Sequence, residues 1–378
     1  MKIRKVLKIP KNEVKMNTPS IAVFPGDGIG PEVIASARAA IEALQGRFDF
    51  QLEMKEWGGG AAYYRETGHD LEEGSFEAAG QADAILLGAM GLPDIRYDDG
   101  TEISPHLRMR SEFGLFAGVR PVKKYANVPS PLGDPRAEDI DFVILRESTE
   151  GLFASRGKGL VENDSIARDF LEITRETSER LFDFAFDLTR RRAERGVGKR
   201  RLTCVDKANV FVSMAFFRKI FDERAQAFPD ISADYSYVDA AALDLVRKPW
   251  DFDVLVMENM FGDILSDLGG GLVGGMGMAP CAEIGLQHAL FQPAHGSAPD
   301  IAGQGKANPT ATLVSAAMML DWLGVRRQDD AMLQAGAALD GAVTRVYAEG
   351  AVHPFEFGGS TGTAAFTEAV VEAIATGG

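Results

Sequence analysis

Two aspartates in the segment FGDILSDL are spaced so that they could bind one metal ion. Asp263 and Asp267 are four positions apart, which places both carboxylates on one face of a helix. Like charges at this spacing destabilise a helix unless a cation neutralises them, and Mg²⁺ or Mn²⁺ prefers carboxylate oxygens. Asp239, at an expected strand-to-helix junction, is a third candidate ligand. A solvent-exposed acidic helix face is the alternative explanation for the pair.

Arginines that could bind carboxylates are concentrated in one stretch of the chain. Arg108, Arg110 and Arg120 lie in LRMRSEFGLFAGVRP, and Arg146 follows the apolar run DFVIL. Arginine suits bidentate recognition of carboxylates, although any one of these residues could be an ordinary surface arginine. The cluster indicates a small acidic substrate.

Lys207 could move a proton. It follows the apolar run LTCV, where its pKa could be lowered enough for it to accept a proton, or it could form a structural ion pair with Asp206. Ligands of open α/β sheets bind beyond the carboxyl ends of the strands. Three expected strands end in charged or amide residues, namely Arg146-Glu147, Asp206-Lys207 and Glu258-Asn259.

Two glycine-rich segments could approach a nucleotide. PGDGIGPEV lacks the G-x-G-x-x-G spacing of the dinucleotide fingerprint, and alone it predicts only a tight turn before a helix. HGSAPDIAG, residues 295–303, combines small residues with Asp300 and is followed by Asn308. An acidic side chain suits a ribose with free hydroxyls and repels a 2′-phosphate. If this loop meets a nucleotide, the sequence therefore favours NAD over NADP.

The elements that must position these residues alternate between strand and helix, which predicts α/β architecture with a largely parallel sheet. We expect residues 126–139 to form a loop or arm and residues 269–277 a flexible crossing between subdomains. Expected core strands cover residues 21–26, 82–88, 141–145, 202–205 and 253–257, with helices starting at Pro31 and covering 168–195 and 209–227.

Composition excludes several classes of function. The length of 378 residues predicts two domains, and the net charge of −15 argues against nucleic acid or anionic membrane as the main partner. No apolar run approaches the ~20 residues of a membrane helix. Only Cys204 and Cys281 are present, which favours a reducing, cytoplasmic location. We interpret the lysine-rich residues 1–17 as a flexible extension.

Six motifs in this order resemble the β-decarboxylating dehydrogenase family, which contains isocitrate, 3-isopropylmalate, homoisocitrate and tartrate/D-malate dehydrogenases. The motifs are GDGIGPEV, RxEFGLFAGVRP, RESTEGLF, DKANV, ENMFGDILSDL and HGSAPDIAG, and the resemblance covers residues 21 to about 375. It implies that family's own two-domain α/β fold rather than a Rossmann fold. Residues 18–115 and 274–378 would form a large NAD-binding domain, and residues 116–273 a small domain with the dimer interface.

The resemblance also implies a role for each matching residue. Lys207 and Asp239 would be catalytic and would reach into the neighbouring subunit's site, so a homodimer is expected. Asp239, Asp263 and Asp267 would bind Mg²⁺ or Mn²⁺. Substrate would contact Arg110, Arg120, Arg146 and Val210, and NAD would contact His295, Gly296, Ser297, Ala298, Asp300 and Asn308.

Three positions depart from the family pattern. Phe153 replaces a tyrosine that helps to protonate the enolate, Gly118 replaces the asparagine of an NVRP motif, and Gln292 replaces a glutamate near the cofactor. A phenyl ring cannot donate a proton, so the last step of the reaction needs another donor. Loss of these groups also suits a rival of another class, a catalytically impaired subunit that binds ligand and regulates a partner.

The expected reaction is NAD-dependent oxidation and decarboxylation of a 2-hydroxy dicarboxylic acid of the 3-isopropylmalate type. Val210 matches the apolar wall of that type. The loop before the first arginine mixes Ile103 and Leu107 with Ser104 and His106, so it does not specify an apolar pocket. Tartrate or D-malate, and isocitrate or homoisocitrate, remain alternative substrates.

Overall fold

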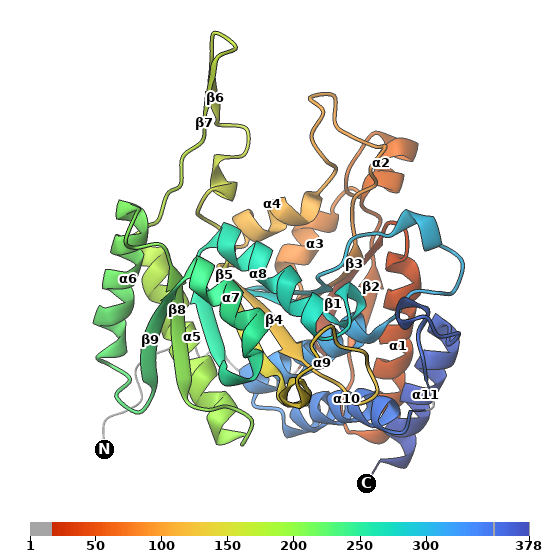
Figure 1. Ribbon diagram of the computed structural model, residues 1–378. Coiled ribbons are helices and arrows are strands. Elements are labelled where there is room, and N and C mark those ends of the chain that lie inside the picture. Colours follow the sequence, from red (N-terminus) through yellow and green to blue (C-terminus); the bar gives the residue numbers. More distant parts are fainter. Residues whose placement is uncertain (1–16, 351, 378) are drawn as a thin grey trace. The chain divides into compact units, whose positions relative to one another are not determined.

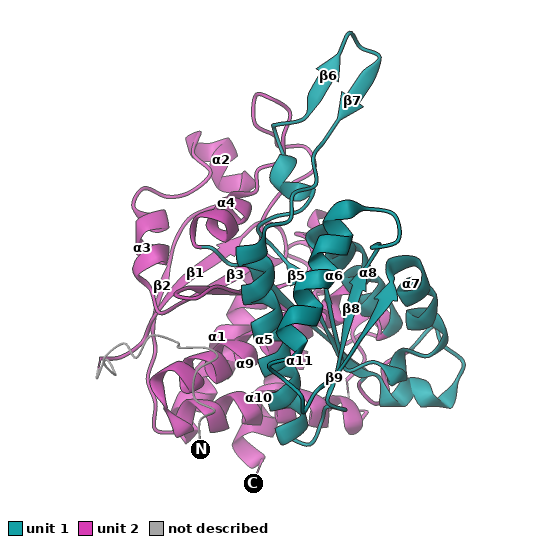
Figure 2. Cartoon of the chain, turned by 90° about the vertical axis from the view of Figure 1, so that its left-hand side faces the viewer, with its two compact units in different colours: residues 1–8, 114–124, 130–272 teal, residues 9–113, 125–129, 273–378 magenta. Residues whose placement is uncertain are grey.

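The computed structural model describes residues 17–350 and 352–377, which form two compact units (Figure 2). Unit 1 contains Gly114–Lys124 and Ser130–Leu272. Unit 2 contains residues 17–113, Tyr125–Pro129 and 273–377 of the described chain. The extension predicted over residues 1–17 lies, apart from Asn17, outside the described residues. Within the described ranges, no helix has both the length and the apolar character needed to cross a membrane.

Unit 2 combines strands from both ends of the chain. β1 (Ser20–Gly26) pairs in parallel with β2 (Glu53–Glu56) on one side and with β3 (Ala84–Ala89) on the other. β12 (Ala289–Pro293) then pairs in parallel with β3, and β11 (Pro280–Ile284) is antiparallel to β12. The predicted strands at 21–26 and 82–88 are therefore present, and their predominantly parallel pairing is confirmed.

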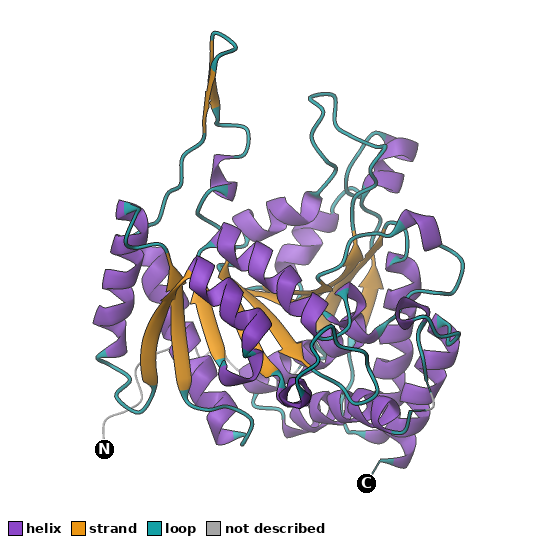
Figure 3. Ribbon diagram, in the orientation of Figure 1, coloured by secondary structure: helices purple, strands orange, loops and turns teal. Residues whose placement is uncertain are grey.

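Helices flank the strands of unit 2 (Figures 1 and 3). The first of them, α1 (Gly30–Arg47), has Pro31 in its first turn, where a missing N–H costs nothing, and it buries a helical stripe that includes Val33, Ile41 and Leu44. The others are α2 (Ala61–Thr67), α3 (Ser75–Gln81), α4 (Pro105–Glu112), α9 (Thr310–Arg327), α10 (Asp330–Ala348) and α11 (Thr363–Thr376).

Unit 1 carries a second group of mostly parallel strands. β10 (Val254–Met257) lies between β5 (Asp141–Glu147) and β8 (Arg201–Asp206) and pairs in parallel with both. β9 (Ser232–Tyr237) extends this order beyond β8, also in parallel, whereas β4 (Ala117–Lys123) is antiparallel to β5. β5, β8 and β10 are almost entirely buried and rich in apolar residues, as the continuous apolar runs predicted, whereas β9 at the end of this order is mostly exposed.

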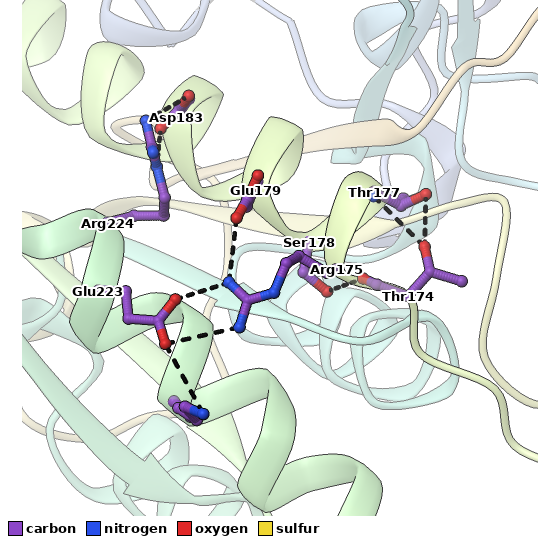
Figure 4. A network of polar contacts seen from close by, with 9 residues as sticks. Thr174, Arg175, Thr177, Ser178, Glu179, Asp183, Glu223 and Arg224 are labelled. Carbon is purple, nitrogen blue, oxygen red and sulfur yellow. Dashed lines mark hydrogen bonds and ion pairs between the residues drawn. The ribbon is translucent and has the colours of Figure 1, made fainter.

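Two pairs of helices pack on the strands of unit 1. α5 (Arg175–Glu194) packs with α6 (Val212–Ala225), and α7 (Val238–Arg247) packs with α8 (Asn259–Leu272). Two ion pairs join α5 to α6 (Figure 4): Arg175 of α5 binds Glu223 of α6, and Arg224 of α6 binds Asp183 of α5. Arg175 also binds Glu179 within α5.

The helix predicted over residues 168–195 begins seven residues later than expected. Thr174 caps α5 by accepting a hydrogen bond from the Thr177 N–H, which fixes the first turn at Arg175. The preceding residues form a two-stranded hairpin, β6 (Leu160–Glu162) and β7 (Ile166–Arg168), which projects from the rest of unit 1 (Figures 1 and 2). Its side chains are exposed, including Val161 at 72%.

The prediction of a flexible crossing at residues 269–277 was wrong for its first half. Helix α8 continues to Leu272, and its glycines are part of the packing. A Cβ at Gly269 would lie 2.7 Å from a methyl group of Val122 on β4, so glycine here allows the helix to approach the strand closely. Within residues 269–277, which the structure describes in full, Gly274 and Gly275 alone have the positive φ angles of an irregular turn.

Candidate active site

The carboxyl ends of three parallel strands bring the polar residues of unit 1 together. Met257 on β10 is level with Arg146 on β5 and with Val205 on β8. The residues that follow these strand positions therefore leave the sheet at one edge. Arg146-Glu147, Asp206-Lys207 and Glu258-Asn259 therefore all lie at this edge of the sheet.

Arg146 is buried and ties β5 to the first turns of α8. Its Nε and Nη2 donate to Asn259 Oδ1 at 2.9 and 2.7 Å, and its Nη1 forms an ion pair with Asp263. Gly262 makes this approach possible, since a Cβ there would lie 2.6 Å from Arg146 Cβ. The guanidinium also lies 5.1 Å from the ring centre of Phe153, which is 45% exposed. A neighbouring helix therefore sets the orientation of Arg146.

Arg120 lies on the same face of the sheet as Arg146. It is opposite Ile144 in the antiparallel β4–β5 register, and Ile144 and Arg146 are two positions apart on one strand. Arg120 is buried, and its charge and that of Arg146 both act on Asp267 of α8. Two arginines and two aspartates therefore form one charged cluster at this edge of unit 1.

The two aspartates of α8 fit part of a metal ligand set. Partial burial and the negative charge of Asp263 raise the pKa of Asp267, while Arg120 and Arg146 oppose this rise. A hard cation would relieve that repulsion. Asp239 is mostly exposed at the start of α7 and binds Lys207. In the described part of the chain, no three histidine, cysteine or acidic side chains gather as a metal site.

Lys207 pairs with Asp239 rather than with Asp206. The Lys207 Nζ lies 2.5 Å from Asp239 Oδ1, and this hydrogen bond lowers the pKa of Asp239. Asp206 instead receives two hydrogen bonds from Arg218, at 2.7 and 2.6 Å, and one from the backbone of Ala208. The alternative prediction of a structural Lys207–Asp206 pair is therefore wrong.

In unit 2, Arg110 is buried whereas Arg108 is a surface residue. Arg110 Nη2 lies 3.0 Å from Glu283 Oε1, and the Glu283 side chain is fully buried on β11. Arg110 Nε is buried as well and has no hydrogen-bond partner among the described residues. Arg108 is exposed, with its guanidinium over the ring of Phe76. Arg110 therefore keeps a donor for an incoming acceptor.

The loop from His295 to Asp300, predicted to contact a nucleotide, combines an irregular backbone with a buried ring nitrogen that has no partner among the described residues. Ser297 Oγ donates to Gly91 O at 2.5 Å, and Ala298 adopts a left-handed conformation with φ of 40° before the exposed Asp300. His295 Nδ1 lies 2.9 Å from Gly296 O, burial lowers the pKa of His295, and its buried Nε2 has no partner in the described ranges. An unpartnered ring nitrogen fits a ligand that brings polar groups.

Asn308 and Gln292 each form hydrogen bonds to other residues of unit 2. The Asn308 amide donates to Glu356 Oε2 at 2.9 Å, and its oxygen accepts from Thr310 at 2.7 Å. Gln292 is buried on β12, where its backbone oxygen accepts from Ser315. Val210, by contrast, is 60% exposed just before α6.

Comparison with known proteins identifies the family. The model of the isocitrate/isopropylmalate dehydrogenase family matches residues 20–374. The chain belongs to this family. The 3-isopropylmalate dehydrogenase of Moorella thermoacetica is 41% identical over 87% of this chain and 91% of its own length. The 3-isopropylmalate/3-methylmalate dehydrogenase of Methanocaldococcus jannaschii is 39% identical over 94% of this chain and 98% of its own.

Solved structures agree with this assignment. The isocitrate dehydrogenase of Methylococcus capsulatus superposes with a TM-score of 0.82 at 34% identity, covering 94% of this chain and 99% of that one. A β-decarboxylating dehydrogenase of Thermococcus kodakarensis gives 0.76 at 34% identity, covering 95% and 96%. The predicted family and fold class are confirmed, and membership of a dehydrogenase family makes the protein an oxidoreductase.

Two residues near the family's expected site were not predicted as site residues. The Asn259 Oδ1 accepts hydrogen bonds from the Nε and Nη2 of Arg146, and Glu283 binds Arg110. A signal for Glu283 existed in the sequence, because it is a lone acid in the otherwise apolar strand PCAEI. Buried acids require a partner, but nothing in the local sequence identifies which arginine supplies it.

Replacing Glu283 should impair substrate binding more than cofactor binding. Glu283→Ala leaves Arg110 buried without its partner, so we expect the KM for substrate to rise about tenfold or more, since a hydrogen bond to a charged group contributes about 1.5–3 kcal/mol. Glu283→Gln keeps an acceptor oxygen and should have a smaller effect. Steady-state kinetics with each substrate varied in turn would measure this.

The control for Glu283 is a buried carboxylate elsewhere. Asp253, directly before β10, accepts from Arg192 Nε at 2.9 Å and from the Lys199 N–H at 2.7 Å. Asp253→Asn should lower stability and leave the KM for substrate unchanged. A substrate KM that rises equally in Asp253→Asn and Glu283→Ala would show that the effect is general destabilisation.

Glu147 should make unfolding depend on pH. Burial raises the pKa of Glu147 from 4.5 to about 7, against the lowering effect of hydrogen bonds from Thr149 and the Glu150 N–H. Between these pH values the folded protein keeps a proton that the unfolded chain has released, so stability falls as pH rises. One pKa unit corresponds to about 1.4 kcal/mol, so the loss should be about 3 kcal/mol.

Chemical denaturation of wild type and Glu147→Gln at pH 5, 6, 7 and 8 would test this expectation. The difference in unfolding free energy between the two proteins should change over this range, because the glutamine cannot ionise. The exposed Glu112→Gln on α4 is the matched control. Parallel pH profiles for wild type and Glu147→Gln would contradict the assignment.

Proposed function

We propose that the protein is an NAD-dependent, divalent-metal-assisted dehydrogenase that oxidises and decarboxylates a 2-hydroxy dicarboxylic acid of the 3-isopropylmalate type. The observation that carries the proposal is the cluster of Arg120, Arg146, Asp263 and Asp267 at the carboxyl edge of unit 1. Arginines that would bind substrate carboxylates and aspartates that would hold a metal ion lie close together there. The names of the relatives from Moorella and Methanocaldococcus support the substrate type.

Substrate carboxylates would be bound by arginine. Arg146 and Arg120 are held in place by the sheet and by α8, so little side-chain freedom is lost when a ligand arrives. Arg110 retains a buried Nε donor. Val210 would contact an apolar substituent of the substrate, which its exposure permits.

Mg²⁺ or Mn²⁺ would be held by Asp263 and Asp267, with Asp239 completing the set. When bound, the ion would lower the pKa of the 2-hydroxyl and stabilise the negative charge that develops as CO₂ leaves. Lys207 would carry the hydroxyl proton while hydride leaves the adjacent carbon for NAD. Lys207 pairs with Asp239 and Arg146 pairs with Asp263 in the structure, so each of these two carboxylates already has a cationic partner that a metal ion would displace or join.

NAD would bind at the 295–308 loop. His295, Gly296, Ser297 and Ala298 would lie along the cofactor, with Asn308 at the far end of the loop. Asp300 is exposed and would accept hydrogen bonds from a ribose with free hydroxyls, whereas it would repel a 2′-phosphate. This residue is the basis for proposing NAD rather than NADP.

Phe153 supports a second candidate function. It packs under Arg146 and offers no hydroxyl to protonate an enolate. A catalytically impaired, regulatory subunit that binds ligand without turnover would tolerate this ring. Tartrate or D-malate, and isocitrate or homoisocitrate, are the alternative substrates if the protein is catalytic.

A homodimer would explain two features of unit 1. Asp239 and Lys207 bind each other rather than the α8 aspartates, so a second copy is needed to complete the site in this proposal. Apolar side chains that water disfavours are also exposed on this unit. The β6–β7 hairpin exposes Leu160, Val161 and Ile166. Phe211 directly before α6 and Val212 at its start are also exposed, and α7 exposes Leu243 and Val246.

Turnover assays test the proposal directly. With Mg²⁺ or Mn²⁺ present, we expect NADH to form from 3-isopropylmalate or one of its analogues, with little activity on NADP and loss of activity on chelation. Lys207→Ala and Asp263→Asn should lower kcat by about a hundredfold or more, since a positioned acid–base group contributes about 10²–10⁴-fold. Near-normal kcat in either variant would remove that residue from the mechanism. Intact metal and NAD binding without turnover on any analogue would favour the regulatory function.

Mixed dimers test whether the site is shared between subunits. Lys207→Ala and Asp263→Asn subunits, each inactive alone, form one intact site when they combine, provided that Lys207 acts in the neighbouring subunit. Random mixing should then restore about one quarter of wild-type activity, because half of the dimers are mixed and each has one intact site. No recovery in a mixture shown to contain mixed dimers would indicate that each subunit uses its own Lys207.

A further inference from the structure

The turn PGDGIGPE contacts the 295–308 loop at two separate points in unit 2. The sequence alone indicated only a tight turn before a helix. In the structure, Gly28 and Ile29 touch Ser297, and Glu32 touches Gly303. We call Gly28, Ile29 and Glu32 the brace. The two contact points lie on either side of Ala298, Pro299 and Asp300.

The first contact requires glycine. The Ile29 N–H donates to Ser297 O at 2.8 Å, and Gly28 has a φ of 59°. A Cβ at Gly28 would lie 1.9 Å from that same Ser297 oxygen, which no side chain could tolerate. The Ser297 hydroxyl donates on its other side to Gly91 O, and the Gly91 N–H in turn donates to buried Asp27 at 2.8 Å. Ser297 is therefore fixed from two directions.

The second contact depends on the Glu32 carboxylate. Glu32 Oε1 accepts from the Gly303 N–H at 2.6 Å, and Oε2 accepts from Thr363 Oγ1 at 3.4 Å. Thr363 also donates its backbone N–H to Gly305 O at 2.8 Å. One side chain of α1 thus fastens the far end of the loop and links it to the start of α11.

Between the two contacts the loop adopts a conformation that an unsupported chain would leave. Ala298 has a φ of 40°, a left-handed conformation that is uncommon for a residue other than glycine. Such conformations persist where the surroundings enforce them. A loop held in its binding conformation before the ligand arrives binds more tightly, because the ordering cost has already been met.

We propose that Glu32 is a positioning residue that presets the nucleotide loop and thereby sets the affinity for the dinucleotide. The inference rests on the proposed function, which places NAD at this loop. Glu32 would act through Gly303 and the loop, without touching the cofactor. Its loss should therefore change dinucleotide affinity while the hydroxy-acid site in the rest of the protein stays intact.

The test compares variants of one helix. Glu32→Ala should raise the Kd for NAD, measured by calorimetry without hydroxy acid, and the KM for NAD by about tenfold, which equals about 1.4 kcal/mol. The kcat and the KM for the hydroxy acid should stay near wild type. Glu32→Gln keeps an acceptor for Gly303 and should restore most of the affinity. Glu42→Ala, an exposed glutamate on the same helix, should have no effect.

Hydrogen exchange of residues 295–308 separates failure of this inference from failure of the proposed function. Faster exchange of the loop in Glu32→Ala, with weaker NAD binding, supports the brace. Unchanged NAD affinity and unchanged loop exchange overturn it. If wild type does not bind NAD, the proposed function fails, and the exchange result alone decides whether Glu32 sets the loop conformation. If Glu32→Ala does not fold, Glu32→Asp keeps the charge, shortens the reach, and should weaken NAD binding about threefold.

Discussion

Parallel pairing of β5, β10 and β8 is the constraint on which the polar site of unit 1 depends. Parallel strands end at the same edge, so residues far apart in the sequence emerge together. Helix α8 begins almost directly after β10. Buried Glu258, between them, accepts hydrogen bonds from the Met260 and Phe261 N–H groups in the first turn of the helix. Burial raises the pKa of Glu258, against the effect of these hydrogen bonds. The helix that carries Asp263 and Asp267 is thereby placed beside Arg146.

Both units contain buried carboxylates that are paired with arginine. Arg218 with Asp206, Arg192 with Asp253, and Arg110 with Glu283 each place a guanidinium against a buried carboxylate. Separating such a pair leaves a buried charge that the protein interior solvates poorly. Each pair therefore fixes the geometry of the elements that it joins. A strongly acidic chain can in this way hold cations in place for acidic ligands without becoming basic overall.

Features with a local signal could be predicted from sequence. The apolar runs ending in charged pairs gave the strand ends, and the i, i+4 spacing of Asp263 and Asp267 gave one shared helix face. The β6–β7 hairpin was missed because its strands are three residues each and hold no core residue that would create a periodic pattern. The close packing at Gly269 and Gly262 was also missed, since a glycine in a helix shows its purpose only when the neighbouring strand is known.

Contacts between distant segments were the least predictable. The partner of Lys207 proved to be Asp239, thirty-two positions away, rather than the adjacent Asp206. The contacts of Gly28 with Ser297 and of Glu32 with Gly303 join residues about 270 positions apart, and no local propensity encodes such a pairing. The predicted assignments of cofactor and substrate residues depend on these long-range contacts, and they remain predictions.

The discontinuity of unit 2 has a consequence for biosynthesis. Strand β3 pairs with β12, and α1 packs against α11, so this unit needs both the first and the last third of the chain. Unit 1 is nearly continuous and can assemble as soon as it leaves the ribosome. Until β12 has been synthesised, strand β3 therefore lacks one of its two neighbours. During that interval the nascent chain exposes an open strand edge of unit 2, the kind of surface that makes partly folded chains prone to aggregation.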